Sequence, residues 1–348
     1  MDYEYVELPS DSAVRCYRAF EGCMLVISAT CFLITVCTML KSSTRAMKTY
    51  RYYLLNELCW SLLCDLSISI ACPISLFPIP CGYAVGWITN FPGNISAAYM
   101  FMGLIIGVGR ASALTFQFLY RFFSALPPGS MISCGIERLQ PYQVILIFVG
   151  QQAFAVIVAT IPFYSSWPDQ DEQKKLLFEN MPFARPILKN HGNIVCVNGG
   201  TRLKYEPSNI VTFIIVLVLL AMGALFGVIL MYSFLRRANL SPATFKLQMM
   251  LFWSLVAQFL AVFALMVVPA VIWTISPVFG ILNGPIVSMF FFSVLLTHTT
   301  VDCAMILYFI KPYRRFLKGA FIGREQSDSE GSKITYFQTE KRRHTLFN

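Results

Sequence analysis

Seven apolar stretches, each long enough to cross a lipid bilayer, constrain the fold of this chain more than any other feature. A spanning helix needs roughly 20 apolar residues at about 1.5 Å of rise each. Only 13% of the 348 residues are charged, against about 25% in a soluble domain. The sequence therefore predicts an all-α membrane protein, a bundle of seven transmembrane helices. The stretches lie near 20–40, 52–77, 97–120, 143–164, 209–235, 247–273 and 285–310.

Basic residues are unevenly divided among the segments that connect the spans. Segment 41–51 carries four of them, whereas 78–96 and 274–284 contain no charged residue. Because an excess of Lys and Arg marks the cytoplasmic side, we expect the N-terminus outside and the C-terminus in the cytoplasm. The net charge of +9 then reflects topology and contact with anionic membrane lipid. It does not indicate a nucleic-acid partner.

The segments outside the spans are short, apart from one loop. We expect an acidic extracellular tail over 1–19 without a cleavable signal peptide, followed by the bundle over 20–310. Apolar and basic residues alternate over 311–323, which predicts an amphipathic juxtamembrane helix. The polar cytoplasmic tail 324–348 has the composition of a disordered segment. The long loop 165–208 is a candidate lid over an outer pocket.

Ionisable side chains inside the spans predict a buried polar cluster. An acid at the centre of a span costs about 2.5–3.5 kcal/mol on insertion scales, so it normally faces the bundle interior and has a partner. Arg110 lies midway along the third stretch, and Asp65 is the first expected partner by depth, with Glu57 second. His298 and Asp302 are four residues apart and share one helix face. Such a cluster either fixes helix packing or rearranges between two states.

Catalytic and metal-binding motifs are missing from the sequence. It has no GxSxG, HExxH, P-loop or dinucleotide fingerprint, and its three histidines are scattered. We therefore expect no enzyme, no cofactor and no metal site. Cys81 and Cys196 both fall on the outer side, where they either form a disulfide or remain free thiols. Asn94 begins an outer glycosylation sequon.

Several short motifs are similar to those of a receptor family. They are Y-R-Y-Y-L-L-N-x-x-x-W-S-x-x-x-D-L at 50–66, P-I-P-C-G-Y-A-V-G at 78–86, Arg121 at the end of the third span and K-P-Y-R at 311–314. In order and spacing they resemble the nematode seven-transmembrane chemosensory receptors, most closely serpentine receptor class H. The resemblance implies a chemoreceptor in the plasma membrane of a sensory-neuron cilium, with a heterotrimeric G protein as its partner.

A receptor of this kind would bind a small-molecule ligand between the outer halves of spans three, five, six and seven. Candidate lining residues are Tyr99, Met102, Phe213, Met266, Trp273 and Phe290. Basic residues on the inner side would face the G protein or lipid headgroups, namely Arg121, Arg236, Arg237, Lys246, Arg314 and Arg315. The alternative function is a transporter or ligand-gated channel subunit that uses the buried charges as an ion path.

Overall fold

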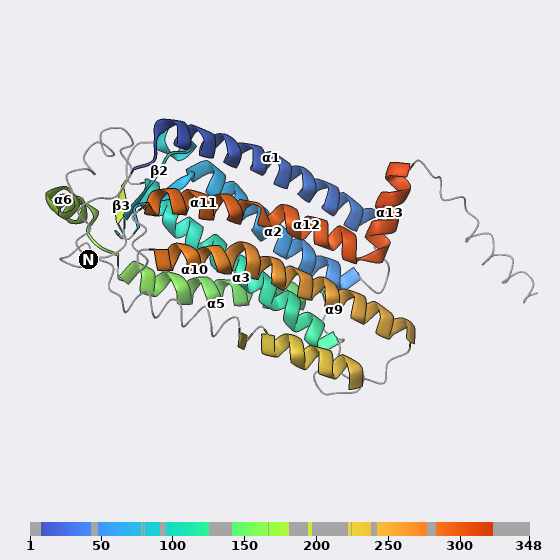
Figure 1. Cartoon of the computed structure of the whole chain (residues 1–348). Helices are drawn as coiled ribbons and strands as arrows, with labels where there is room; N and C mark the ends of the chain where they lie inside the picture. The colour runs from blue at the N-terminus through green and yellow to red at the C-terminus, as the bar shows by residue number, and fades with distance from the viewer. Residues whose placement is uncertain are drawn as a thin grey trace, which may run out of the picture.

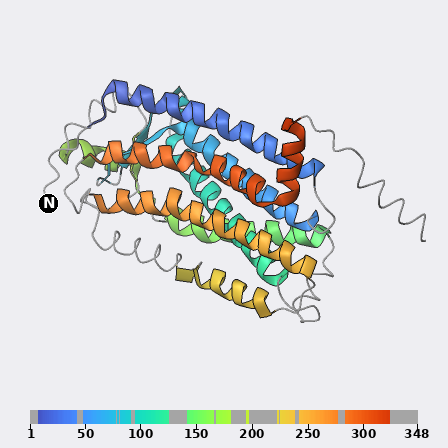
Figure 2. The same cartoon turned by 45° about the vertical axis from the view of Figure 1, so that its right-hand side comes forward.

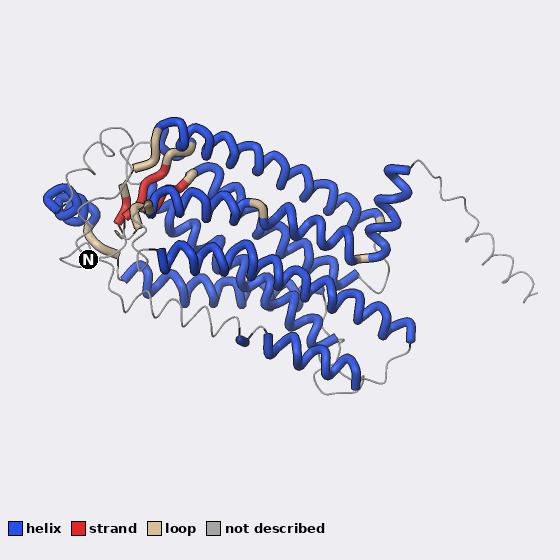
Figure 3. The backbone as a smooth tube through the Cα atoms, in the orientation of Figure 1, coloured by secondary structure: helices blue, strands red, loops and turns tan. Residues whose placement is uncertain are grey.

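Long helices run side by side in one elongated bundle, with a small β-sheet at one end (Figures 1 and 3). We call this the sheet end and the opposite one the α13 end. The computed structural model describes residues 8–42, 48–77, 79, 81–90, 95–124, 141–165, 167–180, 194–196, 222–223, 225–237, 242–276 and 283–322.

Helix α1 (Asp11–Lys41) starts before the apolar stretch predicted near 20–40. The side chain of Ser10 accepts a hydrogen bond from the Ala13 N–H, and Asp11 lies in the first turn, where the helix dipole favours an acid. Its 31 residues extend over about 46 Å, longer than the roughly 30 Å hydrocarbon core. The tail expected over 1–19 is therefore helical from Asp11 onward.

Helix α2 (Lys48–Ala71) leads directly into the sheet. It ends at Ala71, and the next residue, Cys72, has a positive φ of 43° and redirects the chain. Strand β1 (Pro73–Ser75) pairs antiparallel with β2 (Cys81–Ala84), and β2 pairs with β3 (Val195–Cys196) in the order β1-β2-β3. The Pro- and Gly-rich exit from the second span is thus a hairpin. The short helical turn η2 (Trp87–Asn90) follows it.

The middle of the chain supplies further helices of the bundle. They are α3 (Ile95–Ser124), α5 (Pro141–Ser165), a helical segment at 225–237 and α9 (Pro242–Val262). Helix α9 continues through the π-helical turn η4 (Phe263–Val267) into α10 (Val268–Ile275). The short α6 (Gln170–Asn180) lies outside the bundle at the sheet end (Figure 1).

The last predicted span consists of two helices. These are α11 (Gly284–Leu296) and α12 (His298–Phe309), separated by Thr297, whose hydroxyl donates to the Val294 carbonyl at 2.7 Å. Helix α13 (Lys311–Ile322) then turns across the direction of α12 (Figures 1 and 2). Tyr313 on α13 is buried, whereas Lys311, Arg315 and Lys318 are exposed, as in an amphipathic helix at a membrane surface.

Five helices among the described residues are long and apolar enough to cross a membrane. They cover Asp11–Lys41, Tyr50–Ala71, Ala98–Tyr120, Gln248–Trp273 and Gly284–Phe309. The apolar part of α5, Ile145–Val158, is shorter. In the stretch predicted near 209–235, residues 209–221 lie outside the described part of the chain.

Two apolar cores stabilise opposite ends of the bundle. The sheet-end core joins the strands to α1 and α6 through Tyr17, Ile74 and Leu177. The α13-end core joins α1, α2, α9, α12 and α13 and includes Leu54 and Tyr313. Between these cores lie buried charged side chains, among them Glu57, Arg110 and Asp302. We call this part of the interior the polar layer.

Candidate functional site

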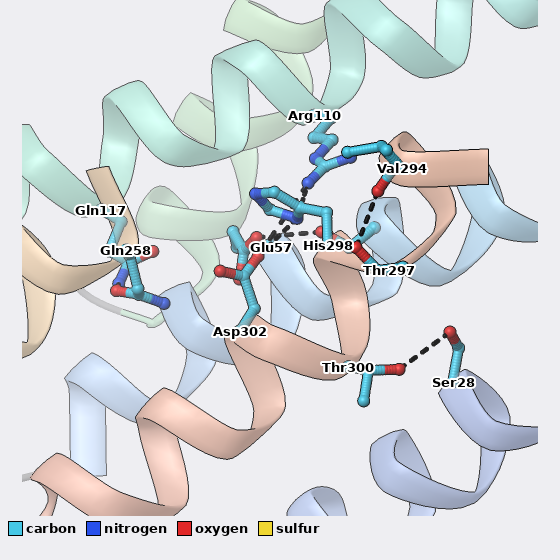
Figure 4. Close-up of polar contacts among 11 residues, drawn as sticks. Ser28, Glu57, Arg110, Gln117, Gln258, Val294, Thr297, His298, Thr300 and Asp302 are labelled. Carbon is cyan, nitrogen blue, oxygen red and sulfur yellow. Dashed lines mark hydrogen bonds and ion pairs between the residues drawn. The ribbon is translucent and has the colours of Figure 1, made fainter. Parts of the chain in front are cut away.

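A buried cluster of charged side chains occupies the polar layer (Figure 4). Arg110 of α3 is 2% exposed, and its Nη2 contacts Nδ1 of His298. The same His298 nitrogen lies 2.9 Å from Oδ2 of Asp302, one helical turn further along α12. The Arg110 Nη2 atom is 3.9 Å from that carboxylate oxygen. His298 thus lies between the guanidinium and its carboxylate partner.

Glu57 of α2 brings a second acid to this group. Its carboxyl lies beside that of Asp302 (Figure 4) and accepts a hydrogen bond from the Ser61 hydroxyl at 2.9 Å. We call Glu57, Arg110, His298 and Asp302 the Arg110 cluster. It ties together α2, α3 and α12 with two carboxyl groups and one guanidinium.

The expected pairing of Arg110 with Asp65 is wrong. The carboxylate partner of Arg110 is Asp302, while Asp65 lies beside the hydroxyls of Ser28 and Thr299. Counting residues along a span estimates the depth of an acid, but it does not tell which way its side chain points around the helix. Asp65 therefore lies against hydroxyl groups of α1 and α12, while the carboxylate that pairs with Arg110 is that of Asp302.

Glu21 is a buried acid that the sequence did not single out. It is 0% exposed and accepts a 3.5 Å hydrogen bond from Ser293 of α11, while its backbone carbonyl accepts from Ser69 of α2. Glu21 lies at the very start of the first apolar stretch, so the sequence suggests that it is exposed next to the outer tail. Because α1 begins ten residues earlier, Glu21 instead faces the bundle interior.

A polar contact on the α13 side of the Arg110 cluster joins three helices. The Gln117 amide nitrogen of α3 donates to the Tyr50 hydroxyl of α2 and to Oε1 of Gln258 of α9, each at 2.8 Å. All three side chains are buried. The contact holds α3 to α2 and α9 where the helices approach the α13 end.

An apolar cavity of about 260 Å³ lies at the sheet end. The strands form much of its wall, and helices α3, α10 and α11 complete it. The described lining residues are mainly apolar or aromatic: Ala71, Pro73, Ile74, Ser75, Phe77, Ile79, Cys81, Gly82, Tyr83, Ala84, Ile88, Tyr99, Met100, Val195, Trp273 and Phe292. Cavities of this kind are the usual sites for small molecules.

A disulfide between Cys81 and Cys196 ties two strands of this wall together. The sequence left the same two cysteines as either a pair or free thiols. Gln170 of α6 reinforces the link, since its amide donates to the Cys196 carbonyl at 2.8 Å and accepts from the Cys196 N–H at 3.0 Å. The long loop between the fourth and fifth predicted spans therefore contributes a fixed strand to the cavity.

The polar groups in the cavity wall are neutral. Burial raises the pKa of the Tyr83 phenol to about 12, so the phenol keeps its proton at physiological pH. The Tyr99 hydroxyl donates to the backbone carbonyl of Ser67. No Asp, Glu, Lys, Arg or His belongs to the described lining. The wall thus presents an uncharged, low-dielectric environment.

Two of the six candidate ligand-binding residues line this cavity, namely Tyr99 and Trp273. Met102 and Phe290 do not line it, and they are 43% and 63% exposed. Met266 packs instead beside a core cluster that includes Leu296. Phe213 lies outside the described residues.

The candidate partner residues gather at the α13 end. Arg236 and Arg237 are exposed at the end of the segment 225–237, Lys246 is exposed near the start of α9, and Arg315 is exposed on α13. Arg314 is half-buried, and its guanidinium lies over the ring of Tyr308. Arg121 is on the last turn of α3, with its side chain outside the described part. Asn94 also falls outside it.

A helical membrane bundle with buried charged side chains, an apolar cavity at one end and a basic surface at the other has the architecture of a seven-transmembrane receptor. The family description "Serpentine type 7TM GPCR chemoreceptor Srh" matches residues 15–323. The chain belongs to this family, as the motifs in its second span and at 311–314 indicated. No curated protein matches the sequence.

Proposed function

We propose that this chain is a chemosensory receptor that binds a small external molecule in the sheet-end cavity and signals to a heterotrimeric G protein at the α13 end. The cavity carries the proposal, because a disulfide-braced apolar chamber at one end of a receptor bundle has the form of a ligand site. The matching family consists of chemoreceptors. We place the receptor in the plasma membrane, at the cilium of a sensory neuron.

The proposed orientation puts the sheet end outside the cell. Disulfides persist in oxidising compartments, and the Cys81–Cys196 bridge lies at this end. Exposed basic residues such as Arg236 and Lys246 lie at the other end, which fits the cytoplasmic side. In this orientation α13 rests on the inner leaflet.

The Arg110 cluster is the proposed link between the two ends. A ligand shifts the balance between an inactive and an active state only by binding one state more tightly than the other. The cluster connects α2, whose end forms part of the cavity wall, to α3 and α12. A ligand-induced shift of α2 or α3 would therefore alter the contacts of Arg110 with His298 and Asp302.

The experiment that tests this function is a ligand screen in cells that express the chain and a second-messenger reporter. The expected result is a ligand response that disappears in otherwise identical cells lacking heterotrimeric G proteins. A ligand-evoked membrane current that persists in those cells would contradict the receptor function. It would instead support a transporter or channel that uses the buried charges as an ion path.

The partner surface can be tested separately. Replacing Arg236 and Arg237 by Ala should leave surface expression and ligand binding intact but reduce G-protein activation. Lys318→Ala is the matched control, since Lys318 is also exposed and basic but lies on α13. Equal loss of activation in the control, or none in the double variant, would remove the two arginines from the proposed partner surface.

A further inference from the structure

We propose that the sheet-end cavity selects uncharged, largely apolar molecules that carry a hydrogen-bond acceptor, and that the indole N–H of Trp273 donates to this acceptor. The inference rests on the proposed function, since it names the ligand class of the same cavity. It does not follow from family membership, which gives no ligand.

The wall of the cavity excludes ionic ligands. Its described residues include no side chain that would be charged at neutral pH, and most of them are apolar. An ion that leaves water for such a site loses hydration and finds no opposite charge among the described lining residues, which costs several kcal/mol or more. Carboxylates and ammonium compounds should therefore bind far more weakly than neutral molecules of the same shape.

The volume of the cavity limits the size of the ligand. An apolar cavity of about 150 Å³ holds one benzene molecule. By the same scale, 260 Å³ accommodates roughly ten non-hydrogen atoms. Monocyclic and short-chain molecules fit within this limit, whereas peptides and nucleotides exceed it.

Trp273 supplies the polar contact. Its Nε1 atom is buried and has no hydrogen-bond partner in the described part of the chain. The Tyr99 hydroxyl, by contrast, already donates to the Ser67 carbonyl. Because the indole nitrogen can only donate and a buried donor without a partner is costly, a ligand with an acceptor would satisfy it.

Neighbouring aromatic rings fix the position of this donor. The Trp273 indole stacks on Phe291 with ring centroids 5.3 Å apart and planes inclined by 13°. Phe77, another lining residue, packs against it at 5.5 Å. Holding the ring in one place lowers the entropy lost when a ligand binds. The donor therefore favours ligands whose acceptor lies at one position relative to the apolar body.

The test measures binding directly, without G protein. The full-length protein is purified into lipid nanodiscs, and its melting temperature is recorded with increasing concentrations of four compounds of similar size and shape. The compounds are acetophenone, the hydrocarbon α-methylstyrene, benzoate and protonated 1-phenylethylamine. They differ in whether they carry an acceptor and a charge.

Acetophenone should bind about tenfold more tightly than the hydrocarbon, and the two ions should give no saturable shift. Trp273→Phe keeps an aromatic ring but removes the N–H, so it should abolish the preference for the ketone. Trp87→Phe is the matched control, because Trp87 is 74% exposed, and it should retain the preference.

Three results would overturn the inference. They are binding of an ion as tight as that of the ketone, an unchanged ketone preference in Trp273→Phe, and the absence of any saturable shift with both neutral compounds. These outcomes are separate from those of the proposed function. A receptor that signals to a G protein in response to an ionic ligand would retain the function and lose this inference.

Discussion

Replacing Arg110 by Met should destabilise the bundle strongly, and replacing Asp302 by Asn in the same chain should recover part of the loss. Both side chains are almost fully buried and their charged atoms are 3.9 Å apart. At an effective dielectric constant of about 20, two unit charges at this distance attract by about 4 kcal/mol. Removing one member of a buried pair costs about 3–5 kcal/mol because the other charge remains without compensation.

A double-mutant cycle measures how much of that cost belongs to the pair. We expect Arg110→Met to cost about 3–5 kcal/mol and the coupling with Asp302→Asn to be about 1.5–3 kcal/mol. Recovery should be incomplete, because Glu57 stays buried beside the vacated site. The free energy of unfolding can be measured by denaturant titration of each purified variant in mixed micelles.

The matched control combines Arg110→Met with Asp65→Asn. Asp65 is equally buried, but it lies beside Ser28 and Thr299, so its coupling with Arg110 should be clearly smaller. Free energies that add within about 0.5 kcal/mol for the Asp302 cycle would refute the pairing. A larger coupling with Asp65 would refute it as well.

Three further perturbations test other parts of the structure. Replacing Cys81 and Cys196 by Ser opens a loop of 115 residues and should lower the melting temperature. Chain entropy sets an upper limit of about 4–5 kcal/mol on the lost free energy of unfolding. An unchanged melting temperature would contradict a stabilising role of the bridge. Cys72 is 3% exposed and should resist a water-soluble thiol reagent in the folded protein while Cys16, exposed on α1 before the apolar stretch, reacts, as mass spectrometry can show. Gln117→Leu leaves Gln258 without its donor and should cost about 1–3 kcal/mol of unfolding free energy, so a loss below about 0.5 kcal/mol would argue against the network.

Composition and hydropathy were sufficient to predict the helical membrane bundle. Spanning helices depend on length and apolarity, which are local properties of the sequence. The family followed from short motifs, above all the one at 50–66, and the match over 15–323 confirms it. The ends of the helices were harder to predict from the sequence. Helix α1 begins at Asp11 because Ser10 caps it, and a cap does not alter hydropathy.

The sequence did not predict which side of its helix each side chain faces. A helix that is apolar on nearly every side does not reveal which face is buried. Tyr99 and Trp273 line the cavity while Phe290 faces outward, although all three are aromatic residues in apolar spans. For the same reason Asp302 and not Asp65 pairs with Arg110.

The β-sheet could not be predicted from the sequence for a different reason. Its strands are short, the longest being Cys81–Ala84, and the segment before it is rich in Pro, which normally argues against a strand. Pairing of β2 with β3 joins residues 115 positions apart, so no local pattern indicates it. The cavity depends on that long-range pairing and could not be expected from the sequence.

The most direct test of the account is the response of cells to an activating ligand when the cavity is filled. Ala84 lines the cavity from β2 and is 8% exposed, so Ala84→Leu should occupy ligand space. Ala98→Leu, at an exposed position of α3, is the control. At equal surface levels, we predict that the second-messenger response is lost in Ala84→Leu and retained in Ala98→Leu. An identical dose–response curve for Ala84→Leu and the unmodified receptor would contradict the assignment of the ligand to this cavity.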